Sequence, residues 1–383
     1  MMKGEAPLAR TKPVFPSKLG VHALCPLRYL YETERPALAS LPRGPAAVKG
    51  IAVHALVAAS KATAPVTGMA LKQDLCERLC ALLACGAGGP IARHALSLNG
   101  LHGVYSRREV LAASQFVMSI LARYGERGFL PAHQVPGRAG GGWKSPFGNE
   151  AWMEDADLDL AGRADLVYRA GDGRIHVVDF KSSRSRTDPI LREQHVLQLV
   201  AYALLVERKV AASSMVLELA TPEGVLEIDV DDRLRGVALG AIDSVKRQFP
   251  RDVVQVPATL AITGGHCSTC AYRAACRAYL QCLSGSGGTL PARTWHDVAG
   301  TVAEVEDLGD VVSMVILRPA GAPCRVDGIL KQALPRNMAG REVAAFNVGC
   351  REIAMHSHTP ANFFVYRPDD PPASAYQAHV HVS

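Results

Sequence analysis

The 383-residue chain has no run of about 18 apolar residues, so a membrane-spanning helix is not expected. Residues 1–18 mix Lys, Arg and Pro without the apolar stretch of a secretory signal peptide. The sequence also has no internal repeat and only ordinary amounts of glycine and proline, which excludes solenoid, collagen-like and wholly disordered proteins. We therefore expect a cytoplasmic globular protein whose ten cysteines are reduced or metal-bound.

Length and charge set limits on the architecture and on the partners. At about 150 residues per domain, a chain of 383 residues is expected to form two domains, or three. The formal net charge is +6, and its basic excess lies within residues 1–284, whereas residues 285–383 carry a slight acidic excess. A polyanion such as a nucleic acid is therefore expected to bind the first part of the chain.

Hydrophobic periodicity changes along the chain. The first third has helical spacing, whereas residues 158–168 and 175–180 read as two strands joined by a turn at Asp172-Gly173. A long helix is predicted at 187–208, followed by a second hairpin and a further helix. This mixture predicts an α/β domain.

The pattern divides the chain into four parts. We expect a flexible arm at 1–16, an α/β domain at 17–284, a Gly/Ser-rich linker at 285–292 and a second domain at 293–383. Five short β-type runs predict that the second domain is a small all-β barrel, OB-like or related. These runs are 298–305, 311–317, 325–331, 342–348 and 363–366.

Two carboxylates and a lysine fall on the predicted hairpin. Asp179 and Lys181 are two residues apart and therefore point to one face, and Asp165 is expected on the neighbouring strand about 4.8 Å away. Converging carboxylates hold hard divalent cations, and Lys181 could orient a water or steady charge on a phosphate. The set favours metal-assisted phosphodiester hydrolysis.

Flanking helices contribute further polar residues. Gln198 and Tyr202 are four residues apart and share a helix face, near His195, while His54 lies on an earlier helix and could complete a metal shell. Taken singly, each residue is typical of a solvated strand face or a packed helix. Their occurrence together and in this order is what favours a site.

Other charged residues follow the same elements. Arg184 and Arg186 come directly after Lys181 and are expected either to contact DNA phosphates or to belong to a solvated loop. The acidic run at 154–159 predicts an exposed edge strand whose charges block further pairing, or else a further metal ligand.

Four cysteines have the spacing of a metal centre. Three closely spaced thiols and one remote thiol can form a tetrahedral sulfur site for an iron–sulfur cluster or a structural zinc, and they are Cys25, Cys267, Cys270 and Cys276. His266 and Cys282 are nearby spare ligands. The remaining cysteines are interpreted as small buried hydrophobes: Cys76, Cys80, Cys85, Cys324 and Cys350.

This ordered set of motifs resembles the PD-(D/E)XK nucleases of the RecB-like exonuclease branch, which includes the nuclease domains of RecB and AddB and the CRISPR-associated protein four exonucleases. The resemblance covers about residues 17–284. It rests on His54 in GIAVH, Gly162 and Asp165 in GRAD, Asp179-Phe180-Lys181, and Gln198-x-x-x-Tyr202. It implies a restriction-endonuclease-like fold, in which a mixed central sheet is flanked by helices.

The resemblance also implies roles for these residues. His54, Asp165 and Asp179 would bind Mg or Mn, Lys181 would be the catalytic lysine, and Gln198 and Tyr202 would position DNA. The cysteine arrangement would hold a 4Fe-4S cluster that fastens the end of the domain to its beginning, in preference to zinc.

The expected function is therefore a Mg- or Mn-dependent deoxyribonuclease, an exonuclease on single-stranded DNA or DNA ends, in DNA repair and recombination or in antiphage or CRISPR defence. The alternative is a nuclease-like protein that binds DNA ends without cutting, or an adaptor that docks a partner. Residues 285–383 depart from the family pattern, and we expect them to dock a helicase or a defence-system protein.

Overall fold

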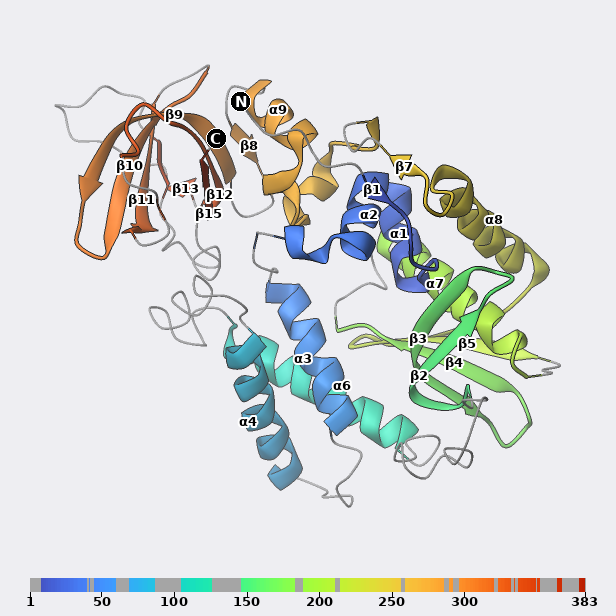
Figure 1. The fold of residues 1–383 in the computed structure, drawn as a ribbon. Coiled ribbons are helices and arrows are strands. Elements are labelled where there is room, and N and C mark those ends of the chain that lie inside the picture. The colour runs from blue at the N-terminus through green and yellow to red at the C-terminus, as the bar shows by residue number, and fades with distance from the viewer. Residues whose placement is uncertain are drawn as a thin grey trace, which may run out of the picture.

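The structure, a computed structural model, describes most of the chain (Figure 1). The described residues are 8–39, 41, 45–59, 69–86, 105–125, 146–182, 189–210, 214–255, 259–285, 289–291, 296–319, 323–331, 334, 337–348, 350–351, 364–366 and 379–382. Among them, no helix is both long enough and apolar enough to cross a membrane.

A mixed five-stranded sheet forms the centre of the first domain. Its order is β2-β3-β4-β5-β6, with β4 and β5 parallel and the other neighbours antiparallel. β4 and β5 are buried along their whole length, as expected for strands covered on both faces. The strands are β2 (Gly148–Asp155), β3 (Leu160–Arg169), β4 (Ile175–Phe180), β5 (Met215–Thr221) and β6 (Gly224–Asp229).

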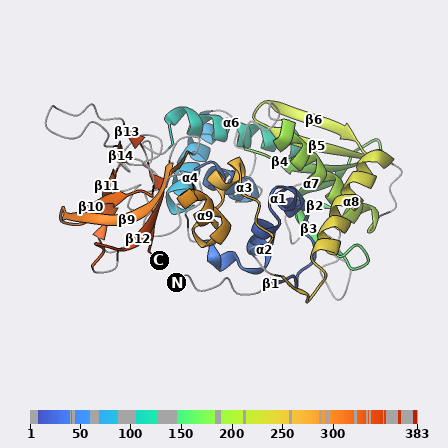
Figure 2. The ribbon, with the colours of Figure 1, turned by 90° about the horizontal axis from the view of Figure 1, so that it is seen from above.

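Helices cover both faces of this sheet, as the family resemblance implies (Figures 1 and 2). One hydrophobic cluster joins the sheet to α1 (Leu19–Leu24), α2 (Pro26–Glu34), α7 (Pro189–Glu207) and α8 (Asp232–Gln248). A second cluster joins the opposite face to α3 (Pro45–Ala59), α4 (Met69–Gly86) and α6 (Arg107–Tyr124). Helix α6 begins at a capping box, in which Ser106 and Glu109 exchange hydrogen bonds.

The segment expected to be a flexible arm is packed where the structure describes it. β1 (Leu8–Ala9) pairs with β7 (Val254–Gln255), and Val14 bridges to Leu160. Leu8 and Val14 are both buried. Burial of these apolar side chains fixes residues 8–16, so the expectation of a flexible arm is wrong for this part of it.

The C-terminal residues form a separate sheet that lies at the other end of the molecule from β6 (Figure 2). Its order is β13-β14-β11-β10-β9-β12-β15, with β8 pairing along β9. All neighbours are antiparallel except β11 and β14. The strands are β8 (Thr289–Pro291), β9 (His296–Asp307), β10 (Val311–Leu317), β11 (Cys324–Leu330), β12 (Glu342–Val348), β13 (Cys350–Arg351), β14 (Phe364–Tyr366) and β15 (His379–Val382).

The predicted barrel is not closed among these described strands, because β13 and β15 end the order without pairing with each other. A sequence pattern can count strands, but it does not specify the stagger and tilt that closure requires. The predicted linker at 285–292 contains β8, which extends the sheet along β9.

A buried polar contact joins this sheet to the cysteine-rich segment. The Arg273 guanidinium lies 2.6 Å from Asp297 of β9, and the Tyr279 hydroxyl of α9 (Arg277–Gly285) donates a hydrogen bond of 2.6 Å to the same carboxylate. Apolar side chains surround it, among them Leu283 and Phe346. The two parts of the chain therefore share a core.

Candidate active site

Asp165 lies at an irregular point of β3. Ala164 packs in the cluster beneath α7, whereas Leu166 packs in the cluster beneath α3. Residues two apart on a regular strand share a face, so the pleat changes phase at Asp165. Opposite this point, Glu150 of β2 has a φ of 54°, in the left-handed region. Such irregularities re-aim side chains, and here the affected side chain is a carboxylate.

The Asp165 carboxylate is held from two sides. Its Oδ2 accepts a hydrogen bond of 2.6 Å from the Phe180 backbone N–H, and its Oδ1 lies 3.4 Å from His54 Nδ1 on α3. Burial alone would raise the pKa of Asp165, but the neighbouring charge of His54 and their hydrogen bond hold this pKa below its ordinary value. Asp165 is therefore ionised at neutral pH.

The pKa of His54 shifts in the opposite direction from that of Asp165. Burial disfavours its charged form, but the charge of Asp165 and their hydrogen bond outweigh burial and raise the pKa of His54 to about 9. Without a metal ion, His54 is therefore protonated at neutral pH. A neutral imidazole is required for metal ligation, so a cation must displace this proton.

Asp179, Lys181 and Gln198 form the adjacent group. Lys181 Nζ donates a hydrogen bond of 2.8 Å to Asp179 Oδ1 and lies 2.7 Å from Oδ2, and Gln198 Nε2 donates one of 2.9 Å to Oδ1. Burial raises the pKa of Asp179 to about 6, although the Lys181 charge opposes this. The pKa of Lys181 is raised, because the two aspartates outweigh burial. The ammonium is therefore retained at neutral pH.

Two further residues of α7 lie beneath the site. Tyr202 is 4% exposed, and its ring contacts Gly162 so closely that an added Cβ there would come within 2.8 Å of Tyr202 and of Pro16. Tyr202 is thus a core residue at the base of the site. The pKa of His195 is lowered to about 4 by burial and by the Lys181 charge, so this imidazole is neutral.

The structure thus brings together five of the residues predicted for the active site, and they are His54, Asp165, Asp179, Lys181 and Gln198. Arg184 and Arg186 lie outside the described residues. The acidic run at 154–159 belongs to edge strand β2 and the turn after it, and there Asp159 pairs with Arg10 at 2.8 Å.

Sequence reasoning missed Glu150. One ligand atom from each of His54, Glu150 and Asp165 lies within 4.8 Å of the others, which makes this set a candidate metal centre. Nothing in the spacing marks Glu150, because its place depends on the register between β2 and β3. Glu150 can be recognised only once the pairing of Ala151 with Ala164 is known, because this register brings Glu150 close to Asp165.

The four predicted cysteine ligands line one cavity, together with Arg28 and Tyr31 of α2; these cysteines are Cys25, Cys267, Cys270 and Cys276. Burial raises the pKa of Cys267 and that of Cys270, so without a bound centre both are thiols. Cys282 is exposed.

The other cysteines differ in burial. Cys324 is buried, as expected, while Cys76 and Cys80 are only half-buried. The side chains of Cys85 and Cys350 lie outside the described residues.

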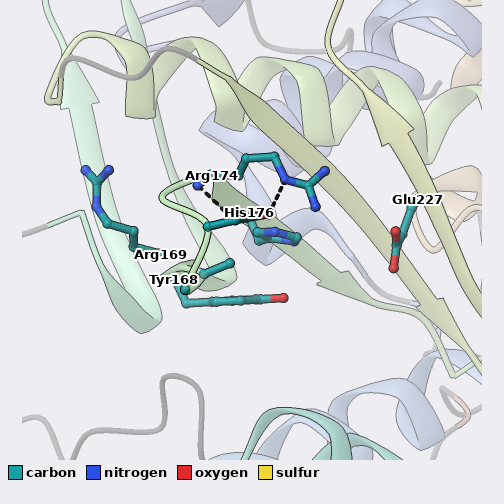
Figure 3. A pocket seen from close by; sticks show the side chains of 8 residues that line it. Tyr168, Arg169, Arg174, His176 and Glu227 are labelled. Carbon is teal, nitrogen blue, oxygen red and sulfur yellow. Dashed lines mark hydrogen bonds and ion pairs between the residues drawn. The ribbon is translucent and has the colours of Figure 1, made fainter.

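A separate cavity of about 550 Å³ opens at the other end of β4, lined by Arg169, Arg174, His176 and Glu227 among others (Figure 3). Its arginines are already engaged: Arg174 lies 2.6 Å from Asp172, and Arg169 donates to a backbone carbonyl. This cavity contains none of the predicted site residues.

A buried carboxylate anchors the same end of the sheet. Glu218 of β5 accepts hydrogen bonds from Tyr168 at 2.6 Å and Tyr124 at 2.8 Å, and lies 2.6 Å from His176 Nδ1. These contacts join three strands to α6 and satisfy the carboxylate, so Glu218 has a structural place in the fold.

The family model of the PD-(D/E)XK nuclease superfamily matches residues 14–277, a range that contains the whole site. No curated protein matches the chain. Among solved structures, the chain is similar to the crystal structure of SSO0001, with 15% identity, 60% of this chain and 95% of that chain covered, and a TM-score of 0.26. Because the family match spans more than half of the sequence, the chain belongs to the PD-(D/E)XK nuclease superfamily.

Proposed function

We propose that the protein is a Mg- or Mn-dependent exonuclease that degrades single-stranded DNA or DNA ends. Membership of the superfamily implies a metal-dependent nuclease that hydrolyses DNA phosphodiester bonds. The observation that carries the proposal is the convergence of Asp165, Asp179 and Lys181 at one end of the sheet.

The donor set suits a hard divalent cation. Carboxylate oxygens and an imidazole nitrogen are ligands for Mg or Mn, and His54, Asp165 and Asp179 supply them. Asp179 Oδ2 is buried and lies 2.7 Å from Lys181 Nζ, so a cation bound at this oxygen would share it with the ammonium. When bound, the metal supplies an activated water and stabilises charge on the phosphate.

The protein side chains would have distinct tasks. Lys181 would hold a positive charge beside the attacking water or the phosphate, and Gln198 would fix the orientation of Asp179 and Lys181 through its amide. Tyr202 would support α7 from the core, with only 4% of its surface left for contact with DNA. Arg184 and Arg186 would contact DNA phosphates.

Cleavage of end-labelled single-stranded DNA with Mn or Mg tests this function, using anaerobically purified protein. We expect Lys181→Ala to lose about 10²–10⁴-fold in rate, as for removal of a group that assists proton transfer. The surface variant Lys246→Ala is the matched control and should cut at the wild-type rate. If neither wild type nor Lys181→Ala cuts while both bind DNA, the alternative of a non-cutting end-binding protein or adaptor replaces this proposal.

We further propose a 4Fe-4S cluster on Cys25, Cys267, Cys270 and Cys276. The four thiols line one cavity, three of them close together in the sequence and Cys25 remote, and this ligand pattern supports an iron–sulfur cluster. Iron and sulfide analysis should give about four of each per chain, whereas one zinc and no iron would contradict the assignment.

We propose that the protein trims DNA ends in repair and recombination or in antiphage or CRISPR defence. The acidic excess of residues 285–383 supports docking of a helicase or a defence-system protein at the C-terminal sheet over binding of a DNA strand.

A further inference from the structure

Glu150 of β2 lies close to the Asp165 carboxylate of β3. Glu150 and Asp165 lie between the registered pairs Asn149–Leu166 and Ala151–Ala164, and a ligand atom of one lies within 4.8 Å of a ligand atom of the other. Like charges placed opposite each other on neighbouring strands destabilise a sheet. The arrangement therefore needs a positive charge between or beside the two carboxylates.

In this structure that charge comes from two side chains. His54 lies 3.4 Å from Asp165, and the Arg163 Nε lies 2.7 Å from Glu150 Oε2. The Arg163 side chain is 61% exposed, so its ion pair is open to solvent and weak. A small divalent cation could replace both positive charges at once.

The spacing of the three ligands fits such a cation. In octahedral geometry with metal–oxygen distances of about 2.1 Å, two ligand atoms lie roughly 3 to 4.2 Å apart. Ligand atoms of His54, Glu150 and Asp165 already lie within 4.8 Å of one another. Only a small contraction of the set is therefore required.

We propose that Glu150 is a further ligand of the divalent metal, and that Arg163 is the cation that holds its carboxylate until the metal binds. The proposal deepens the proposed function and rests on it. Asp179 is engaged by Lys181 and Gln198, so Glu150 supplies a carboxylate from the opposite side of Asp165. The competing interpretation is an ordinary surface ion pair that stabilises the edge strand.

The two interpretations predict different signs. If Arg163 competes with the metal for Glu150, removing the carboxylate weakens metal binding, whereas removing the guanidinium strengthens it. If the pair only stabilises β2, both changes weaken the site together or leave it unchanged.

Calorimetric titration of the full-length chain with Mn²⁺ separates them. We expect Glu150→Gln to weaken Mn²⁺ affinity by about 10–100-fold, and Arg163→Gln to strengthen it by roughly 1.5–5-fold. Glu154→Gln is the matched control, because Glu154 is an exposed carboxylate on the same strand, four residues along, and should bind Mn²⁺ like wild type. Glu150→Asp, which keeps a shorter carboxylate, should recover part of the affinity, and a melting curve for each variant verifies folding.

Unchanged affinity in a folded Glu150→Gln variant would overturn the inference, and so would weaker binding in Arg163→Gln. A wild-type protein that binds no Mn²⁺ would overturn the proposed metal centre itself. If the wild type binds Mn²⁺ and Glu150→Gln binds it with the same affinity, only the role of Glu150 would be overturned.

Discussion

At the scale of single residues, the site depends on how buried charges compensate one another. Asp165 and His54 stabilise each other's ionised forms. In contrast, burial raises the pKa of Asp179, although the Lys181 charge opposes this. The two aspartates therefore differ in pKa, although both are mainly ionised at neutral pH. A divalent cation would favour the ionised form of Asp179 and the neutral form of His54.

This balance predicts a pH dependence of stability in the metal-free protein. The pKa of His54 rises from 6.5 in the unfolded chain to about 9 in the folded one, so the folded state binds more protons between these values. Stability from His54 is fully present below pH 6.5 and is lost as the pH rises through 9. Melting curves in EDTA should show a falling Tm across this window.

The variant His54→Gln supplies the control for this measurement. It should show a flatter dependence of Tm on pH between 6.5 and 9, because the titrating imidazole is absent. An equally steep fall in this variant would contradict the assignment to His54.

At the scale of secondary-structure elements, the hairpin of β3 and β4 and helix α7 could be predicted, because turn chemistry and periodicity are local properties. Placement of Asp179 beside Lys181 followed from the strand period alone. The phase change at Asp165 could not be predicted, because it depends on packing against two different layers of helices. Glu150 was missed for the same reason.

Gly162 of β3 lies against Tyr202 of α7, and replacing this glycine tests how closely the strand and the helix pack. A Cβ at this position would come within 2.8 Å of both Tyr202 and Pro16, so Gly162→Ala should cost about 1–3 kcal/mol of unfolding free energy through overpacking. Because Tyr202 shares α7 with Gln198, we also expect slower cleavage.

A second glycine gives the comparison. Gly171 lies at the β3–β4 turn with nothing within 4 Å of an added Cβ, so Gly171→Ala should leave stability and cleavage near the wild-type values. Denaturant unfolding of both variants measures the difference. Equal stability of the two would argue against close packing at Gly162.

At the scale of the whole molecule, the cysteine-rich segment is joined to the C-terminal sheet where Arg273 meets Asp297. Arg273 stands between Cys270 and Cys276 in the sequence, so the contact links the cysteine site to β9. Both side chains are almost fully buried, and removal of one partner leaves the other charge uncompensated. The division into domains seen in the sequence is therefore not a division into independent bodies.

The expected cost of breaking this pair is large. Asp297→Ala should lower the unfolding free energy by about 3–5 kcal/mol, because a buried guanidinium is left without its counter-ion. Asp307→Ala, which breaks an exposed pair with Lys331 on the same sheet, should change stability little. Chemical denaturation of the full chain measures both, and similar values for the two variants would contradict a structural role for the buried pair.

The meeting of Cys25 with Cys267, Cys270 and Cys276 has a consequence for the timing of synthesis. The ribosome makes the partners of Cys25 more than 240 residues after it, which at 5–20 residues per second takes roughly 12–50 s. The apolar side chains of α1 and α2 also precede their partners, because α2 ends 155 residues before α7 begins and 198 residues before α8 begins. Nascent chains stalled before residue 189, where α7 begins, should therefore leave α2 open to proteolysis, and the earliest part of the protein is among the last to become stable.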